Sequence, residues 1–319
     1  MHKKTNETSP KLIVIYGPTV TGKTNLAIKL AKRHNGEIIS ADSRQIFKNL
    51  DIGTGKVDFN SKVEKHNGYW IVNGVKIHGF DIKKPEEKYS AAEFIKFAKK
   101  TLEQIRKSKK LPILVGGTGF YIKSFLYGLE SAGIKENSKL RSTLSKLTAL
   151  ELYHRLAKLN AQKAQSLNES DKKNPRRLIR ALEIEKSKPK LSTQKIEEFE
   201  GNVKVIGLTA SNEYLYKKAN KWLWARLDNG LVSEVEKLLQ TVNYRWLLSL
   251  GLEYKWLTLF KKGKIEKEQA VKRLQGEIHA FIRRQKMWFR QFKKIEIHNI
   301  SQKSAIKLIE KSIDDFIKF

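Results

Sequence analysis

Short apolar runs alternate with an amphipathic stretch along the first part of the chain. The runs KLIVIY (11–16), EIISAD (37–42) and LPILVGGTG (111–119) are rich in β-branched residues and too short for core helices, so they predict buried strands. After the first of them, apolar residues recur at helical spacing: Leu26, Ala27, Leu30 and Ala31. Strands that alternate with helices predict an α/β fold, with a parallel sheet covered by helices on both faces.

Two local signals add further elements between these strands. The segment YWIVNGVKIHGFD (69–81) has the pair Asn73-Gly74 between two apolar stretches, which predicts a β-hairpin. Ser90 and Glu93 have the spacing of a capping box, and the apolar positions that begin at Phe94 predict an amphipathic helix after it.

The second half of the chain has a mostly helical pattern. Residues 135–186 are rich in Lys, Arg, Asn and Gln, and they predict a helical insertion domain within an α/β core formed by 1–134 and 187–319. The run NVKVIGLTA (202–210) predicts a further strand of that core. We expect the remaining residues to form helical stretches near 212–240, 246–262 and 266–292, a short strand at 294–298 and a last amphipathic helix.

The charge balance adds a partner to this picture. Lys and Arg total 64 against 33 Asp and Glu, which gives a net charge of +31. One phosphate-binding pocket does not account for so large an excess, so the sequence predicts a polyanionic partner, either RNA, DNA or an anionic membrane surface. The alternative is that the lysines are scattered over solvated faces.

Two absences narrow the classes of function. The chain has no cysteine, which excludes disulfides, iron–sulfur ligation, zinc fingers and a cysteine nucleophile. The residues before the first strand are polar, and no apolar run reaches the roughly 18 residues of a membrane-spanning helix. We therefore expect a cytoplasmic protein that does not enter a membrane, and we expect a monomer.

The segment after the first strand carries the most specific chemistry. GPTVTGKT (17–24) matches the P-loop pattern G-x-x-x-x-G-K-[ST], with a predicted strand before it and a predicted helix after it. Backbone N–H groups of such a loop point at linked phosphates, the lysine adds positive charge, and the last hydroxyl can hold Mg²⁺. The predicted diphosphate-binding residues are Gly17, Pro18, Thr19, Val20, Thr21, Gly22, Lys23 and Thr24, and Thr24 is the predicted Mg²⁺ ligand.

The strand ends distinguish this chain from an ordinary P-loop ATPase. In such an ATPase a strand usually ends in an Asp that supports the water shell of the metal. Here the run at 111–119 ends in Gly116-Gly117-Thr118, whereas EIISAD ends in Asp42. Asp42 is therefore a candidate general base for a proton on an acceptor molecule. Its alternative role is to cap the turn that follows.

Several segments, in their order along the chain, resemble the tRNA dimethylallyltransferase family. After the P-loop they are ISADSRQIFKNLDIGTGK (39–56), HGFDIKKPEEKYSAAEF (78–94), LVGGTGFYIKSFLYG (114–128), NPRRLIRALEI (174–184), ARLDNGLVSEVEKLL (225–239) and FIRRQKMWFRQF (281–292). The resemblance extends nearly from end to end and implies a P-loop NTPase-like core. It also implies a reaction in which the P-loop holds dimethylallyl diphosphate with Mg²⁺ and no ATP is hydrolysed. The dimethylallyl group passes to N6 of the adenosine 3′ of the anticodon, in tRNAs that read codons beginning with U.

The resemblance implies roles for individual residues. Asp42 accepts the N6 proton, Thr118 hydrogen-bonds near the reacting centre, and Arg284 contacts the diphosphate or a tRNA phosphate. Because an adenine stacked in a loop does not reach such a pocket, we expect the base to be flipped out. The implied contacts to the tRNA anticodon stem-loop are Asp42, Ser43, Arg44, Gln45, Thr118, Arg141, Arg176, Arg177, Arg180, Arg283, Arg284, Gln285, Trp288 and Arg290.

Two groups of these residues have alternative explanations. The helix at 283–290 interleaves arginines with Trp288, as single-stranded RNA recognition requires, but the same run suits an amphipathic helix with its Trp in the core. The arginines at 176–180 also suit a plain solvated helix face.

The chain departs from the family pattern at two places. The family usually has Gly-Tyr followed by a basic residue where this chain has Gly251-Leu252-Glu253-Tyr254, so the adjacent Tyr254 is a candidate replacement for that tyrosine. The threonine and arginine common before the RRQ segment are replaced near His279 and Ala280. These departures leave an RNA contact at the first place and a donor contact at the second open.

Three other functions remain open from the sequence. An adenylate isopentenyltransferase would act on a free nucleotide, although the insertion, the segment RRQKMWFR and the charge of +31 argue against it. A P-loop small-molecule kinase would hold ATP in the loop instead of dimethylallyl diphosphate. A nucleotide-gated RNA-binding protein without catalysis would leave the pairing of Asp42 with Thr118 unexplained.

Overall fold

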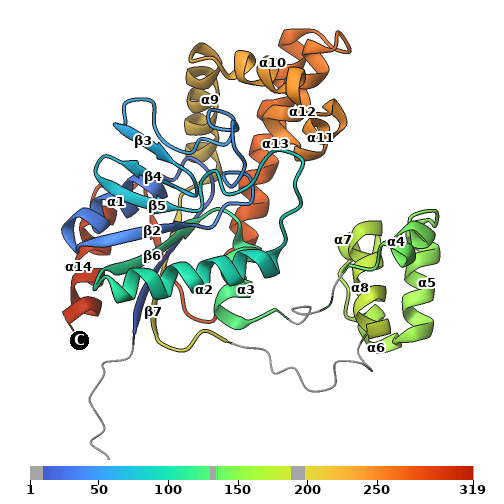
Figure 1. Cartoon of the computed structure of the whole chain (residues 1–319), viewed down its shortest axis with the longest axis horizontal. Coiled ribbons are helices and arrows are strands. Elements are labelled where there is room, and N and C mark those ends of the chain that lie inside the picture. Colours follow the sequence, from blue (N-terminus) through green and yellow to red (C-terminus); the bar gives the residue numbers. More distant parts are fainter. Residues whose placement is uncertain (1–9, 130–133, 135, 188–197, 319) are drawn as a thin grey trace, which may run out of the picture. The chain divides into compact units, whose positions relative to one another are not determined.

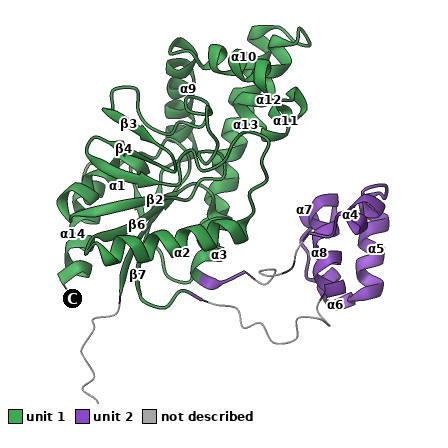
Figure 2. Ribbon diagram, viewed as in Figure 1, with its two compact units in different colours: residues 1–126, 199–319 green, residues 127–198 purple. Residues whose placement is uncertain are grey.

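The computed structural model describes residues 10–129, 134, 136–187 and 198–318. The chain divides into two compact units, of which the first combines residues 1–126 with 199–319 and the second is residues 127–198 (Figure 2). The second unit contains the predicted insertion at 135–186 and extends beyond it at both ends.

The first unit is built on a sheet whose described strands follow the order β3-β4-β5-β2-β6-β1-β7-β8. All pairs from β5 across to β8 are parallel, and the edge strands β3 and β4 join antiparallel. The strand bounds are β1 Lys11–Tyr16, β2 Gly36–Ser40, β3 Val63–His66, β4 Tyr69–Val72, β5 Val75–His78, β6 Leu111–Gly116, β7 Asn202–Thr209 and β8 Glu296–Asn299. The predicted hairpin is present, because Asn73 and Gly74 both adopt positive φ between β4 and β5.

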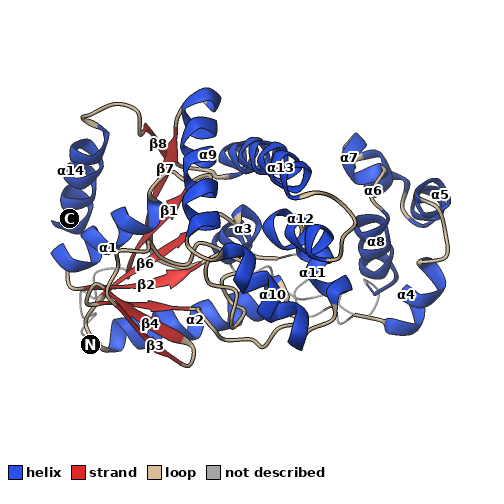
Figure 3. Cartoon of the chain, turned by 90° about the horizontal axis from the view of Figure 1, so that it is seen from above, coloured by secondary structure: helices blue, strands red, loops and turns tan. Residues whose placement is uncertain are grey.

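Helices cover both faces of this sheet, as the alternation of elements predicted (Figures 1 and 3). Helices α1 (Lys23–Arg33) and α14 (Ala305–Lys318) share a core with Ile13 and Ile15 of β1. Helices α2 (Ala91–Lys107) and α3 (Gly119–Tyr127) lie on the other face. The predicted capping box begins α2, where the backbone N–H of Glu93 donates to Ser90 Oγ at 3.2 Å.

A group of helices with its own core extends from one end of the sheet (Figure 1). It comprises α9 (Asn212–Asp228), α10 (Leu231–Thr241), α11 (Tyr244–Leu250), α12 (Leu252–Lys261), α13 (Lys267–Met287) and the 3₁₀ turn Trp288–Gln291. The segment after β2 also contributes Ile46, Phe47 and Leu50 to this core. This packing brings the residues after Asp42 against the C-terminal helices.

Three details of the structure differ from the predictions. The helix expected at 212–240 breaks at Gly230 (φ 93°), and the one expected at 246–262 breaks at Gly251 (φ 70°), since a positive φ does not continue an α-helix. Strand β3 was not predicted, because its sequence VEKH is polar and mostly exposed. The last strand lies at 296–299 rather than 294–298.

The second unit is a small helical bundle. Its helices are α4 (Ser138–Leu144), α5 (Ala149–Leu159), α6 (Ala161–Gln165), α7 (Glu169–Lys172) and α8 (Pro175–Ser187). Leucines form most of its core, which includes Leu144, Leu152, Leu156, Leu178 and Leu182. Side chains of Asn137, Asn160 and Asn168 cap three of the helices, which explains part of the asparagine content of this segment.

Candidate functional site

The P-loop joins β1 to α1 and opens onto a cavity of about 540 Å³. The loop turns on Val20 (φ 59°) and Gly22 (φ 79°), and the second of these residues precedes the first turn of α1. A Cβ on Gly17 would lie 2.7 Å from the carbonyl oxygen of Leu208, so only glycine fits there. The loop residues that line the cavity are Thr19, Val20, Gly22, Lys23 and Thr24.

The surroundings of Lys23 destabilise its charged form in the absence of a bound anion. Its Nζ donates to the carbonyl oxygen of Pro18 at 3.3 Å. Burial lowers the pKa of Lys23 to about 8, and the negative charge of Asp42 acts in the opposite direction. An anion bound beside Nζ would stabilise the charged form and reverse the effect of burial.

Asp42 follows β2 and lines the same cavity. Its Oδ1 accepts the backbone N–H of Arg44 at 2.9 Å and that of Gln45 at 3.4 Å, so the capping role considered from the sequence is present. Its Oδ2 accepts no hydrogen bond from the residues that the structure describes. The carboxylate therefore keeps one oxygen available for a proton, and capping does not exclude the role of a general base.

The ends of β2 and β6 meet at Thr118. The backbone N–H of Thr118 donates to the carbonyl oxygen of Ala41 at 3.2 Å, and Thr118 Oγ1 accepts the backbone N–H of Ser43 at 3.1 Å. A Cβ on Gly116 would lie 2.1 Å from the Ala41 oxygen, which explains the glycine at this strand end. Asp42 and Thr118, which are distant in sequence, therefore lie side by side at the carboxyl edge of the sheet.

The C-terminal part of α13 closes the cavity from another side. Arg284, Gln285 and Trp288 line it. Gln285 is 4% exposed, and its Oε1 accepts the backbone N–H of Thr19 at 2.9 Å while its Nε2 donates to the carbonyl oxygen of Gly117 at 3.0 Å. The structure thus gives Gln285 a role inside the protein, joining the P-loop to the end of β6, where the sequence suggested a tRNA contact.

Several cavity residues were missed by the sequence analysis. Gly53, Thr54 and Gly55 lie in a segment that carried the resemblance but had received no role. The two glycines were the signal in the sequence that other groups approach this segment closely. A Cβ on Gly53 would lie 2.5 Å from Tyr254 Oη, and one on Gly55 would lie 2.6 Å from the Trp222 ring. Other lining residues come from helices whose packing has no local signature: Phe120, Lys218, Trp222, Ile278 and Phe281.

Of the other predicted arginines, Arg44 lines the cavity, whereas the rest lie outside its lining: Arg141, Arg176, Arg177, Arg180, Arg283 and Arg290. Arg283 is exposed and donates to Tyr216 Oη at 2.7 Å, and Arg290 is also exposed. In the second unit Arg141 pairs with Glu183 and Glu136, Arg177 with Asp171, and Arg180 with Glu183, whereas Arg176 is exposed. Arg141, Arg177 and Arg180 thus stabilise the second unit by ion pairs. Contact with RNA stays a prediction for all six arginines.

The two departures from the family pattern have internal roles. Tyr254 is fully buried, so the suggestion that it replaces an RNA-contacting tyrosine is wrong. Its hydroxyl donates to Glu234 at 2.9 Å. His279 stacks on Tyr216 with ring centroids 4.0 Å apart, and its Nε2 lies 2.9 Å from Asn220 Oδ1.

Comparison with known proteins places these features in a family. The IPP transferase family model matches residues 45–292. A tRNA dimethylallyltransferase of Parabacteroides distasonis is 39% identical over 91% of this chain and 92% of its own length, and one of Anoxybacillus flavithermus is 36% identical over 88% and 87%. The solved tRNA delta(2)-isopentenylpyrophosphate transferase of Staphylococcus epidermidis is 31% identical, with a TM-score of 0.65 over 96% of this chain and 99% of that one. In the described part of this chain, no helix is both long and apolar enough to cross a membrane.

Proposed function

The chain belongs to the IPP transferase family, and we propose that it transfers the dimethylallyl group of dimethylallyl diphosphate to N6 of an adenosine in the anticodon loop of tRNA. The observation that carries this proposal is the meeting of Lys23, Asp42, Thr118 and Arg284 on one cavity. A phosphate cradle and a carboxylate base on the same cavity suit a reaction with a diphosphate leaving group and an acceptor that loses a proton.

The P-loop side of the cavity suits the diphosphate. Lys23 and the N-terminus of α1 supply positive charge, and Arg284 lines the same cavity as a further cation. Thr24 lines the cavity, and the described residues contain no cluster of three His, Cys, Asp or Glu side chains that would form a protein-only metal site. This donor set fits Mg²⁺, which usually takes few protein ligands and keeps waters and substrate phosphates. Bound there, Mg²⁺ would neutralise charge on the departing diphosphate.

The reaction breaks the bond between the allylic carbon and the diphosphate oxygen and forms a bond from that carbon to N6. The N6 proton passes to Asp42 Oδ2, the oxygen that does not cap the following turn. Thr118 lies beside Asp42 and orients the acceptor amine. Charge that develops on the leaving diphosphate is met by Lys23, Arg284 and backbone N–H groups, which are fixed before the reaction begins.

The other walls of the cavity suit the apolar and aromatic parts of the two substrates. Phe120 and Trp288 lie with ring centroids 6.2 Å apart, and Phe281 and Ile278 line the same cavity. These side chains can cover a dimethylallyl group and stack on an adenine that has been flipped out of its loop.

Binding of tRNA is supported by charge and by the second unit. The net charge of +31 and the exposed arginines of α8 and of the 3₁₀ turn after α13 offer phosphate contacts outside the cavity. We expect the anticodon stem-loop of a tRNA that reads codons beginning with U to be the minimal acceptor. The cytoplasmic location and the monomeric state expected from the sequence stay predictions.

Mass spectrometry of digested tRNA tests the donor, the acceptor and the reaction together. We expect incubation with dimethylallyl diphosphate and Mg²⁺ to convert one adenosine per acceptor tRNA into N6-dimethylallyladenosine. A tRNA in which that adenosine is replaced by guanosine is the control and should gain no prenyl group. Transfer of phosphate from ATP instead would support the kinase alternative and contradict the proposal.

A further inference from the structure

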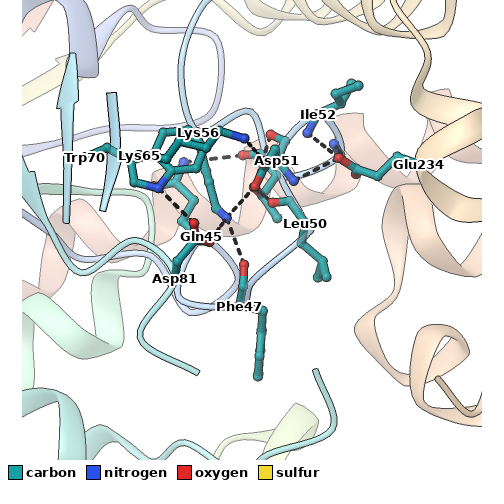
Figure 4. Close-up of polar contacts among 12 residues, drawn as sticks. Gln45, Phe47, Leu50, Asp51, Ile52, Lys56, Lys65, Trp70, Asp81 and Glu234 are labelled. Atoms are coloured by element: carbon teal, nitrogen blue, oxygen red, sulfur yellow. Dashed lines mark hydrogen bonds and ion pairs between the residues drawn. The ribbon is translucent and has the colours of Figure 1, made fainter. Parts of the chain in front are cut away.

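One wall of the cavity is a short loop whose backbone N–H groups are bound by the carboxylate of a single side chain, Glu234. We call residues Asp51–Gly55 the wall loop, because Gly53, Thr54 and Gly55 line the cavity. The carboxylate of Glu234 on α10 accepts three successive backbone N–H groups of this loop, from Asp51 at 2.9 Å, Ile52 at 2.6 Å and Gly53 at 2.9 Å (Figure 4). These three N–H groups thus donate to a side chain, whereas in a β-strand such groups donate to the backbone of a neighbouring strand.

A second pair of charges holds the carbonyl side of the same loop. Arg226 of α9 donates to the carbonyl oxygens of Gly53 at 2.6 Å and Ile52 at 3.3 Å, and to Glu253 at 2.7 Å. The side chains of Arg226 and Glu253 are only 1% and 3% exposed. Both backbone polar groups of Ile52 and of Gly53 are therefore hydrogen-bonded to side chains from the helices behind the loop.

The departure from the family pattern at Gly251–Tyr254 contributes two members of this network. Tyr254 donates to Glu234 at 2.9 Å and blocks the space beside Gly53. The second oxygen of Glu253 lies 4.0 Å from Arg44, whose backbone N–H holds Asp42. The segment thus connects the wall loop with the residue that fixes the proposed base.

The other end of the loop is equally constrained. The ammonium group of Lys56, which is fully buried, donates to the carbonyl oxygen of Phe47 at 2.8 Å and to Asp51 and Asp81 at 2.6 Å each (Figure 4). Burial alone would raise the pKa of Asp51, but Lys56 and Lys65 hold it below its ordinary value. Between these fixed ends, Gln45 Nε2 donates to the carbonyl oxygens of Thr54 at 3.3 Å and Gly55 at 3.2 Å, and Glu234 and Arg226 hold the backbone of the residues before them.

We propose that Glu234 is a positioning residue of the transfer reaction, which lies outside the cavity lining and acts through the wall loop. Glu253, which lines the cavity, supports the same loop through Arg226. The expected change in kcat/KM rests on the proposed function, whereas the expected change in the wall loop concerns the chain without any substrate. Charged acceptors of backbone N–H groups bind more strongly than neutral ones, so the Glu234 carboxylate defines the wall more sharply than an amide would. A displacement of about 1 Å in such a wall costs up to about a hundredfold in rate.

Glu234→Gln is the direct test, because the substitution keeps the size of the side chain. Three N–H groups and the Tyr254 hydroxyl then compete for one carbonyl oxygen, and the new NH₂ group faces other donors. Glu236→Gln on the same helix is the matched control, since Glu236 is 41% exposed and pairs only with Lys261 among the described residues.

Two readouts decide the outcome, both at a temperature where far-UV circular dichroism shows the variant folded. Without substrates, we expect amide hydrogen exchange to accelerate in residues 51–53 of Glu234→Gln and not across the sheet. With substrates, we expect kcat/KM to fall about tenfold to a hundredfold. The Glu236→Gln control should match the wild type in both. Unchanged exchange at 51–53, or accelerated exchange with unchanged kcat and KM, overturns the proposal, since a merely stabilising role leaves the folded enzyme's kinetics intact.

Tyr254→Phe keeps the question decidable if Glu234→Gln does not fold. The variant removes one donor to Glu234 and leaves the carboxylate in place, so we expect a smaller loss of kcat/KM with the same local change in exchange. No change in either quantity contradicts the proposal. If the wild-type chain itself transfers no prenyl group, the proposed function fails, while the exchange measurement still tests the wall loop.

Discussion

The cavity of the first unit and the helical second unit use positive charge in opposite ways. Among the described residues, Lys23 and Arg284 line the cavity and form no ion pair, so their charge is available to a ligand. In the second unit Glu183, which is 1% exposed, binds Arg141 and Arg180, and Asp171 pairs with Arg177. The cations of the cavity can therefore bind a substrate, whereas those of the second unit form ion pairs that join α4, α7 and α8. Basic residues that look alike in the sequence thus differ in what their loss would do.

The largest effect that we expect from the cavity side is that of Asp42→Asn. The amide keeps the oxygen that caps the turn at Arg44 but does not accept a proton, so kcat should fall by up to about 10⁴-fold. The affinity for tRNA should stay near that of the wild type. Single-turnover kinetics and a filter-binding assay measure the two quantities. Wild-type turnover in this variant would leave capping as the only role of Asp42.

Salt separates the two uses of charge next most strongly. If binding neutralises roughly six tRNA phosphates, the affinity for tRNA should fall about a thousandfold between 50 and 200 mM salt. Donor binding, which is confined to the cavity, should change far less. Fluorescence anisotropy of a labelled tRNA at several salt concentrations checks this. A flat response would mean that the excess lysines only solvate the surface.

Glu183→Gln should damage the second unit and spare the cavity. Loss of the carboxylate weakens its hydrogen bonds to Arg141 and Arg180, which are 33% and 29% exposed, and Arg141 keeps its pair with Glu136, so we expect a cost of about 1.5–3 kcal/mol of folding free energy. We expect a protease to cleave the variant faster than the wild type within 127–198, and we expect weaker tRNA binding. Donor binding measured by calorimetry should stay unchanged. Glu169→Gln is the matched control, since Glu169 is 76% exposed and its loss should change neither. Weakened donor binding in Glu183→Gln would contradict the separation of the two regions.

The smallest expected effect is a pH dependence of donor binding. The pKa of Lys23 is about 8 before the donor binds, so above this pH the lysine must take up a proton to meet the diphosphate. Donor affinity should therefore fall as pH rises through 8, by up to about tenfold per pH unit. Lys23→Arg, which stays charged, should flatten the profile. A flat wild-type profile between pH 7.5 and 9.5 would show that Lys23 does not pair with the donor.

Elements with a strong local pattern could be predicted from the sequence. The P-loop, β1, β2 and β6 each combine an apolar run with a characteristic turn, and Asn73-Gly74 sets its own hairpin. The helix breaks at Gly230 and Gly251 were missed because one glycine inside a helical pattern does not reveal its φ. Polar edge strands such as β3 have no alternation to detect.

The site residues that belong to a sequence motif could be predicted, whereas those that reach the cavity through the packing of distant helices could not. The P-loop with Lys23 follows β1, and Asp42 and Thr118 follow β2 and β6, whose carboxyl ends a parallel sheet brings together. Lys218 and Trp222 enter the cavity because α9 packs against the wall loop, a contact between residues far apart in sequence. The internal roles of Gln285 and Tyr254 could not be foreseen either, since burial is a property of the whole fold.

A competition between two acceptors tests the central claim most directly. The chain is given dimethylallyl diphosphate with equal concentrations of AMP and an anticodon stem-loop, and the products are separated by mass spectrometry. Our account predicts that the prenyl group is found on N6 of one adenosine of the RNA and that AMP stays unmodified. Faster prenylation of AMP than of the stem-loop would contradict it.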